Sequence, residues 1–150
     1  MTGAGSLGRT ERIDRSRARA WILQIHYRWE SEGSIGTLRN ALVETQATRR
    51  ISPRRLPYVR RVLALMDEHL SEVDETLRGA LDNWRLDRLS TIDRAVLRIG
   101  AMEILYVEDV PPKVAIQEAI RLAEMYGGDD SPGFVNGVLN AVYKGRTRAS

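Results

Sequence analysis

One predicted helix that is apolar on nearly every face limits most strongly what this chain can fold into. Ser90 and Thr91 offer its start, and the residues from there to Val107 are apolar almost all round. Other elements must enclose such a helix, because an ordinary surface helix keeps one polar side. The rest of the chain repeats apolar residues at helical spacing and carries poor strand signals. The sequence therefore predicts an all-α protein with a central, buried helix.

Further helices are expected from apolar periodicity and from residues that start or stop helices. They cover about residues 14–30, 34–47, 57–84, 112–126 and 131–145. Within the third of these, Ser71 and Asp74 have the spacing of a capping box, so a new turn is expected to start there and to continue to about Trp84.

The length of 150 residues fits one domain, or two small subdomains that share a core. Residues 13–145 contain the predicted helices and form the expected helical domain. Residues 1–12 are expected to be a flexible, basic N-terminal arm, and residues 146–150 a flexible tail. Neither segment contains apolar residues in any number.

The composition argues against several classes of function. Because the chain has no cysteine, disulfides, cysteine-ligated metals and thiolate catalysis are excluded. His26 and His69 fall on different predicted helices without neighbouring ligands, so no metal is expected, and no motif points to a cofactor. No motif places a catalytic group, so the protein is expected not to be an enzyme. The absence of a long apolar run or a secretory signal predicts a cytoplasmic protein that does not enter a membrane.

Glu103 is the one unusual carboxylate, because it lies in the apolar stripe of the central helix between Ile99 and Val107. A buried general acid and a structural carboxylate would give the same pattern. We expect the structural role, with the carboxylate hydrogen-bonded or ion-paired across the bundle.

A basic and aromatic face on the first predicted helix suggests contact with single-stranded RNA. Arginines outnumber acidic residues between residues 9 and 19. Leu23 and Tyr27 point away from the centre of the apolar face, in line with Arg12 and Arg19. RNA binding needs cations for the phosphates and an aromatic plane for a base. In the alternative interpretation, which the pattern alone favours, Leu23 and Tyr27 pack on another helix and the arginines are solvated.

A polar loop before the last helix offers a second candidate contact. Tyr126 closes the preceding helix, and Phe134 falls at the edge of the apolar face of the last one. The loop between them ends at a helix N-terminus, where backbone N–H groups can receive a phosphate. Asp129 and Asp130 argue against a general anion site, although either can accept hydrogen bonds from base amino groups. On spacing alone, a capping loop flanked by two core aromatics is the better explanation.

Three blocks of the sequence resemble the NusB family. Residues 17–30, RARAWILQIHYRWE, look like its opening helix, and residues 93–105, DRAVLRIGAMEIL, look like its central helix. Residues 110–142, VPPKVAIQEAIRLAEMYGGDDSPGFVNGVLNAV, look like its C-terminal signature. The blocks follow the order and spacing of the family, and the likeness covers about residues 15–144.

The resemblance implies two small helical bundles packed together, here about residues 13–84 and 85–145. It implies a non-catalytic transcription antitermination factor that binds the boxA segment of nascent ribosomal RNA jointly with the ribosomal protein NusE and helps RNA polymerase pass terminators. The RNA contacts of the family fall on Arg15, Arg17, Arg19, Tyr27, Tyr126, Asp130 and Phe134. Its NusE-binding surface falls around Asp93 and Arg94.

Two positions depart from the family pattern. Ser16 interrupts what is often an unbroken arginine run, and Gln117 stands where asparagine is usual. Neither departure disturbs the implied assignment, but affinity for boxA without NusE is expected to be low. Two alternatives stay open: a stand-alone NusB-like domain related to ribosomal RNA cytosine methyltransferases, and a helical protein-interaction adaptor. The resemblance also leaves open whether the chain forms a homodimer.

Overall fold

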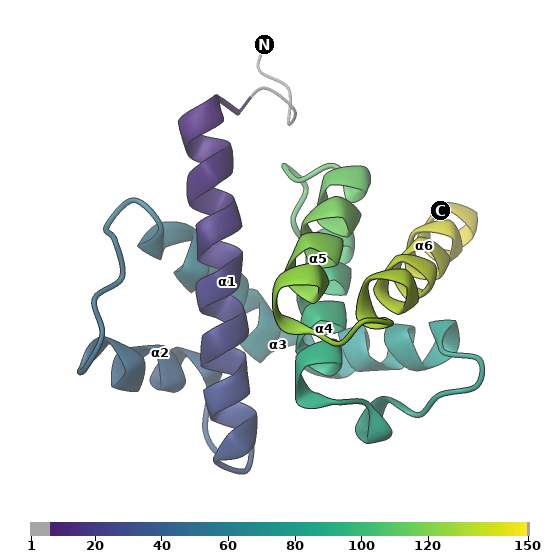
Figure 1. Ribbon diagram of the computed structural model, residues 1–150, viewed down its shortest axis with the longest axis horizontal. Helices are drawn as coiled ribbons and strands as arrows, with labels where there is room; N and C mark the ends of the chain where they lie inside the picture. Colours follow the sequence, from purple (N-terminus) through teal and green to yellow (C-terminus); the bar gives the residue numbers. More distant parts are fainter. Residues whose placement is uncertain (1–6, 150) are drawn as a thin grey trace.

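The structure, a computed structural model, describes residues 7–149, and every regular element within them is helical. The elements are α1 (Arg9–Ser31), α2 (Leu38–Gln46), α3 (Leu56–Ala80), the short 3-10 helix η1 (Leu86–Arg88), α4 (Thr91–Tyr106), α5 (Pro112–Tyr126) and α6 (Ser131–Ala149). In Figure 1, α4 and α5 lie between α1 on one side and α6 on the other. The prediction of an all-α fold is confirmed.

The central position of α4 follows from its apolar surface. This helix packs against α1, α3, α5 and α6, and all of its residues from Ala95 to Ile104 are buried. Gly100 allows α5 and α6 to approach closely, because a Cβ at this position would lie 2.5 Å from Cδ1 of Leu139 and 3.3 Å from Cβ of Ala119. The predicted buried central helix is therefore confirmed.

The third helix differs from its prediction, because α3 is one uninterrupted helix. Ser71 lies in its exposed middle, and Asp74 is buried and bonds to Arg98, so neither residue caps a new turn. The backbone becomes extended at Leu81, directly after the helix. Trp84, which was expected in the helix, lies in the exposed connection to α4.

The first helix starts earlier than predicted, at Arg9, and therefore includes part of the segment expected to be a flexible arm. Glu11 helps to explain the early start, since its carboxylate accepts a hydrogen bond of 3.2 Å from the backbone N–H of Gly8. The remainder of the predicted arm, residues 1–6, lies outside the described residues. At the other end, α6 runs to Ala149, through most of the predicted tail.

A single hydrophobic core extends through both halves of the chain. Because α3 packs against α4 and α6 as well as α1 and α2, the core is continuous across the boundary that was predicted between residues 84 and 85. The division into two subdomains stays a prediction. Among the described residues, no helix is long and apolar enough to cross a membrane.

Candidate nucleic-acid and protein interfaces

One face of α1 is at least partly exposed along its length and carries two of the predicted RNA-binding residues. Tyr27 keeps 48% of its surface exposed, and Arg17 is exposed without a carboxylate partner among residues 7–149. The two positions are ten residues apart, so they lie on the same side of the helix, about 15 Å apart along it and about 80° apart around it. A free guanidinium and an open aromatic ring are the two groups that single-stranded nucleic acid needs.

Arg15 lies at the edge of this face and is partly buried. Its Nη2 donates to Oδ2 of Asp109 at 2.7 Å, and Nη2 of Arg61 donates to the other oxygen of the same carboxylate at 2.7 Å. Hydrogen bonds from Arg61 and Arg15 hold the pKa of Asp109 well below its usual range. Arg15 also lies over the ring of Tyr58, with 4.6 Å between the guanidinium carbon and the ring centroid. These contacts leave Arg15 less available than Arg17 for a phosphate.

The placement of Arg19 on the exposed face is wrong. Its side chain is buried, with Nε 2.7 Å from Oε2 of Glu103 and Nη1 3.1 Å from Oε1 of Glu118. Burial alone would lower the pKa of Arg19, but the charge of Glu103 beside it raises this pKa. Leu23 is buried as well. The reason is that α2 and α3 cover α1 on one side while α4 and α5 cover it on another, so its buried arc is wider than one apolar stripe.

Glu103 is buried and held by partners, as predicted. Besides the ion pair with Arg19, its Oε2 accepts a hydrogen bond from the hydroxyl of Tyr58. Burial, together with the carboxylate of Glu103, raises the pKa of Tyr58 above its usual range. The three side chains come from α1, α3 and α4, so this cluster joins these helices inside the protein.

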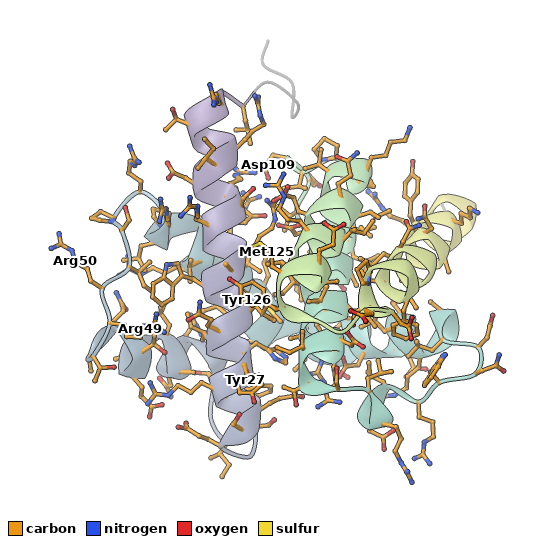
Figure 2. All side chains as sticks on the ribbon, viewed as in Figure 1. Tyr27, Arg49, Arg50, Asp109, Met125 and Tyr126 are labelled. Atoms are coloured by element: carbon orange, nitrogen blue, oxygen red, sulfur yellow. The ribbon has the colours of Figure 1, made fainter. Side chains whose placement is uncertain are left out.

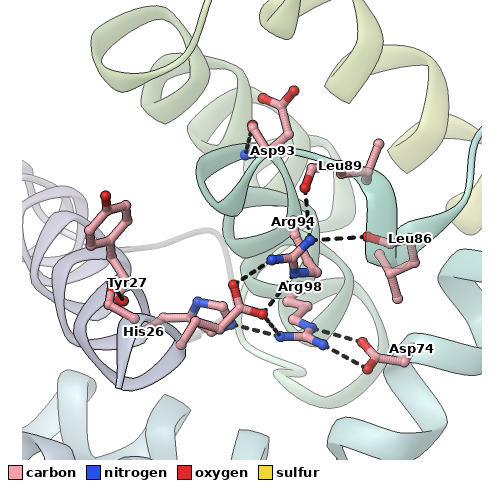
Figure 3. A network of polar contacts seen from close by, with 11 residues as sticks. His26, Tyr27, Asp74, Leu86, Leu89, Asp93, Arg94 and Arg98 are labelled. Atoms are coloured by element: carbon pink, nitrogen blue, oxygen red, sulfur yellow. Dashed lines mark hydrogen bonds and ion pairs between the residues drawn. The ribbon is translucent and has the colours of Figure 1, made fainter. Parts of the chain in front are cut away.

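Arg94, predicted to face a protein partner, makes its contacts within the chain (Figure 3). Its Nε and Nη2 donate to the two carboxylate oxygens of Glu30 at 2.7 and 2.8 Å. Its Nη1 donates to the backbone carbonyls of Leu86 and Leu89 at 3.2 and 2.8 Å. Arg94 therefore fixes the connection before α4 to α1, which leaves its side chain little exposed, and its contact with a protein partner stays a prediction.

A deeper part of the same network was not foreseen from the sequence. Arg98 donates to both oxygens of Asp74 at 2.9 Å, to Oε2 of Glu30 at 3.1 Å, and lies 3.0 Å from Nε2 of His26. Burial and the adjacent charge of Arg98 lower the pKa of His26 to about 4. The sequence signal for this part of the network was an arginine within the largely apolar stretch of the central helix.

Asp93 lies in a hollow of about 270 Å³ near the start of α4, which is lined by Trp84, Leu89, Asp93, Gly128, Asp129, Asp130, Ser131 and Phe134. Ser131 donates a hydrogen bond of 2.6 Å to Oδ1 of Asp93 and accepts one of 3.0 Å from the backbone N–H of Gly128. These bonds fix the loop before α6. Asp130, predicted to read RNA, thus lies in the same hollow as Asp93, predicted to bind protein.

The aromatic rings of this region differ in exposure. Phe134 is half-buried against the core and forms an edge-to-face contact with Trp84, with 5.7 Å between the ring centroids. Trp84 itself keeps 61% of its surface exposed, and Tyr126 keeps 40%. Among the described residues, no cation pairs with the carboxylates of Asp129 and Asp130. The hollow therefore disfavours phosphates and suits a base amino group or a basic side chain.

No group of histidine, aspartate and glutamate side chains in residues 7–149 is arranged to hold a metal ion. The buried charges described above are joined to one another across helix interfaces.

Comparison with known proteins gives a consistent result. A sequence model described as the NusB family matches residues 16–144. A transcription antitermination protein NusB from Methylacidiphilum infernorum (isolate V4) is 35% identical over 132 residues, which are 88% of this chain and 92% of that protein.

Solved structures are similar over comparable lengths. NusB from T. maritima superposes with a TM-score of 0.78 at 32% identity, covering 87% of this chain and 90% of that one. A chain from a crystal structure of the antitermination factors NusB and NusE in complex with double-stranded RNA superposes with a TM-score of 0.77 at 25% identity. It covers 88% of this chain and 97% of that one.

Proposed function

Because this chain belongs to the NusB family, we propose that it is a transcription antitermination factor. It binds boxA-type single-stranded RNA in nascent ribosomal RNA together with NusE, and the complex helps RNA polymerase pass terminators. Its role is to hold RNA and protein together and not to catalyse a reaction. A role in transcription places the protein in the cytoplasm.

The exposed face of α1 carries this proposal. Arg17 offers a guanidinium that no carboxylate of the described residues neutralises, and Tyr27 offers an open ring. Phosphates attract the first group and bases stack on the second. Tyr126 extends the aromatic surface from the end of α5, on the face of the molecule that also shows Tyr27 (Figure 2). Arg15 supplies a weaker phosphate contact, because Asp109 already pairs with it.

The hollow at the start of α4 supports the joint part of the proposal. Asp93 and the exposed ring of Trp84 offer a carboxylate and an apolar surface for NusE. Asp130 and Phe134 lie on the same hollow and contact the RNA base that lies nearest the partner. RNA and NusE then meet at adjacent surfaces, so each should raise the affinity for the other.

The test is a binding titration of boxA-like RNA and a scrambled RNA of equal length, with and without the cognate NusE. We expect NusE to strengthen binding of the boxA sequence more than that of the scrambled sequence. The Tyr27→Ala variant should lose about 1–3 kcal/mol of RNA affinity, as expected for one stacked base. Equal binding of both RNAs in the presence of NusE would contradict the proposed function.

A further inference from the structure

Two adjacent arginines in the connection between α2 and α3 carry charges that no carboxylate of the described residues neutralises. Other arginines of the same connection pair with a carboxylate: Arg54 and Arg55 lie 3.5 and 3.3 Å from the oxygens of Asp14. Arg49 and Arg50 have no acidic partner among residues 7–149, and both are exposed. Their charge is therefore available to a ligand.

Arg49 is held in place by uncharged groups. Its guanidinium carbon lies 4.8 Å from the centroid of the Trp21 ring, and its Nη1 donates to Oε1 of Gln24 at 2.8 Å. Its backbone N–H also donates to the carbonyl of Thr45 at 2.9 Å, which anchors the segment to the end of α2. The guanidinium of Arg49 has five N–H donors, and stacking on the ring with one hydrogen bond to an amide oxygen uses only part of them. The remaining N–H groups are free to bind a phosphate.

Arg50 follows at the rim of a shallow hollow of about 370 Å³ that is lined by Gln46, Thr48, Arg49, Arg50 and Ile51. No carboxylate lines this hollow, whereas the hollow at the start of α4 contains three aspartates. Two unneutralised positive charges next to each other attract a polyanion.

The two arginines continue the exposed face of α1. Arg49 contacts α1 at Trp21 and Gln24. Trp21 lies one helical turn after Arg17, and Gln24 lies about one turn before Tyr27. Arg49 therefore lies beside the exposed face of α1, between Arg17 and Tyr27. Figure 2 shows Arg49 and Arg50 on one side of α1, and Met125 and Tyr126 on its other side. A strand that contacts Tyr126 and Tyr27 can therefore cross α1 towards the connection.

We propose that single-stranded RNA bound on α1 continues beyond the boxA-type segment onto residues 47–51, where Arg49 and Arg50 contact the phosphates of the flanking nucleotides. This inference rests on the proposed function, because it extends the same RNA surface. The contact adds affinity without reading sequence, since phosphates carry no base information. An acidic protein segment is the competing occupant of this surface.

The test compares a minimal boxA-like RNA with the same RNA lengthened by unstructured nucleotides at its 5′ end or at its 3′ end. Wild-type protein with NusE should bind one of the extended RNAs more tightly and with a steeper salt dependence than the minimal RNA. In the double variant Arg49→Ala/Arg50→Ala this advantage should disappear, while the minimal RNA is bound as before. The salt slope is the steepness with which the logarithm of the binding constant falls with the logarithm of salt concentration. Two lost phosphate contacts should lower this slope by about 1.4, which corresponds to about a 25-fold loss of affinity at 0.1 M salt relative to 1 M salt.

Two controls separate the proposal from a folding defect and from loss of charge alone. Arg50→Ala removes an exposed side chain that makes no hydrogen bond or ion pair in residues 7–149, so its melting temperature should be unchanged while about half of the slope difference is lost. Arg60→Ala/Arg88→Ala removes two other exposed, unpaired arginines and should bind the extended RNA as wild type does.

Equal binding of the extended RNA by the wild type and the Arg49/Arg50 variant overturns this inference alone. Weaker binding of NusE to that variant, with unchanged RNA binding, assigns the surface to protein. Absence of RNA binding by the wild type overturns the proposed function as well.

Discussion

Arg17 and Arg19 lie two positions apart on α1, and their surroundings give them different roles. Arg17 is exposed and free of carboxylates within the described residues, whereas Arg19 is buried between Glu103 and Glu118. The first can meet a ligand, and the second neutralises charge inside the protein. An arginine-rich stretch thus serves both binding and stability.

Removal of Arg19 should therefore lower the stability of the protein, and removal of Arg17 should weaken RNA binding. Arg19→Ala leaves the buried carboxylate of Glu103 without its cation, so the free energy of unfolding should fall by about 3–5 kcal/mol. Arg17→Ala should change the free energy of unfolding by less than about 0.5 kcal/mol and should reduce the salt slope of RNA binding by about 0.7. Urea unfolding and RNA titration of both variants provide the measurement. A stable Arg19→Ala protein would show that the buried pair does not hold the fold together.

At the scale of the helices, a buried polar network joins α1, α3 and α4 (Figure 3). His26 and Glu30 come from α1, Asp74 from α3, and Arg98 from α4, where it contacts all three. His26 faces no solvent, and the adjacent charge of Arg98 opposes its protonation. Protonation of this ring should therefore loosen the contact between these helices.

The stability of the protein should fall as the pH falls below neutral. The pKa of His26 is about 4 in the folded protein and 6.5 in the reference state, so between these values the unfolded chain binds a proton that the folded protein does not. From pH 7.5 to pH 5 the free energy of unfolding should decrease by about 2 kcal/mol through this group. The pKa of Glu30 is also lowered, from a reference value of 4.5. The stability linked to this group is lost mainly below pH 4.5, which is outside the window from pH 7.5 to pH 5.

Urea unfolding at the two pH values checks this expectation. His26→Gln keeps an acceptor for Arg98 but cannot be protonated, so its stability should vary much less between pH 7.5 and pH 5. His69→Gln, which changes the other histidine of the chain, should keep the wild-type pH dependence. If His26→Gln and wild type lose stability equally, another group is responsible.

The success of sequence-based prediction varied with the element. The boundaries of α5 were predicted at the residues observed, because Pro112 and Gly127 have strong local effects on a helix. The break at Ser71 was wrong because burial of Asp74 against Arg98 outweighs a local capping pattern. Arg19 was misplaced because a helical wheel shows one apolar face and cannot show that two sets of helices cover α1. Arg98 was missed since its partners are distant in sequence.

At the scale of the whole molecule, the protein offers two surfaces of different charge. The face formed by α1 and the connection after α2 carries Arg17, Arg49 and Arg50 without acidic partners in the described chain. The hollow at the start of α4 carries Asp93, Asp129 and Asp130. A polyanion is attracted to the first surface, and a basic protein segment is attracted to the second.

The partner surface can be tested apart from the fold by changing Asp93 alone. Asp93→Lys should weaken binding of NusE and leave the protein folded, apart from the loss of the bond from Ser131. Arg94→Glu should instead lower the free energy of unfolding by about 3 kcal/mol or more, because it places a second carboxylate against Glu30. Pull-down with NusE and thermal unfolding distinguish the two outcomes. Unchanged capture of NusE by Asp93→Lys would exclude this hollow as the partner surface.

Terminator readthrough by RNA polymerase tests the proposed function directly, in a defined transcription reaction that contains NusE and the remaining antitermination factors. Adding this protein should increase readthrough on a template that encodes a boxA leader and should leave a template with a scrambled leader unchanged. The variant Arg17→Ala/Tyr27→Ala, whose two side chains are exposed, should remain folded and fail to increase readthrough. Equal readthrough on both templates would contradict the proposed antitermination function, and full activity of this variant would exclude the exposed face of α1 as the RNA-binding surface.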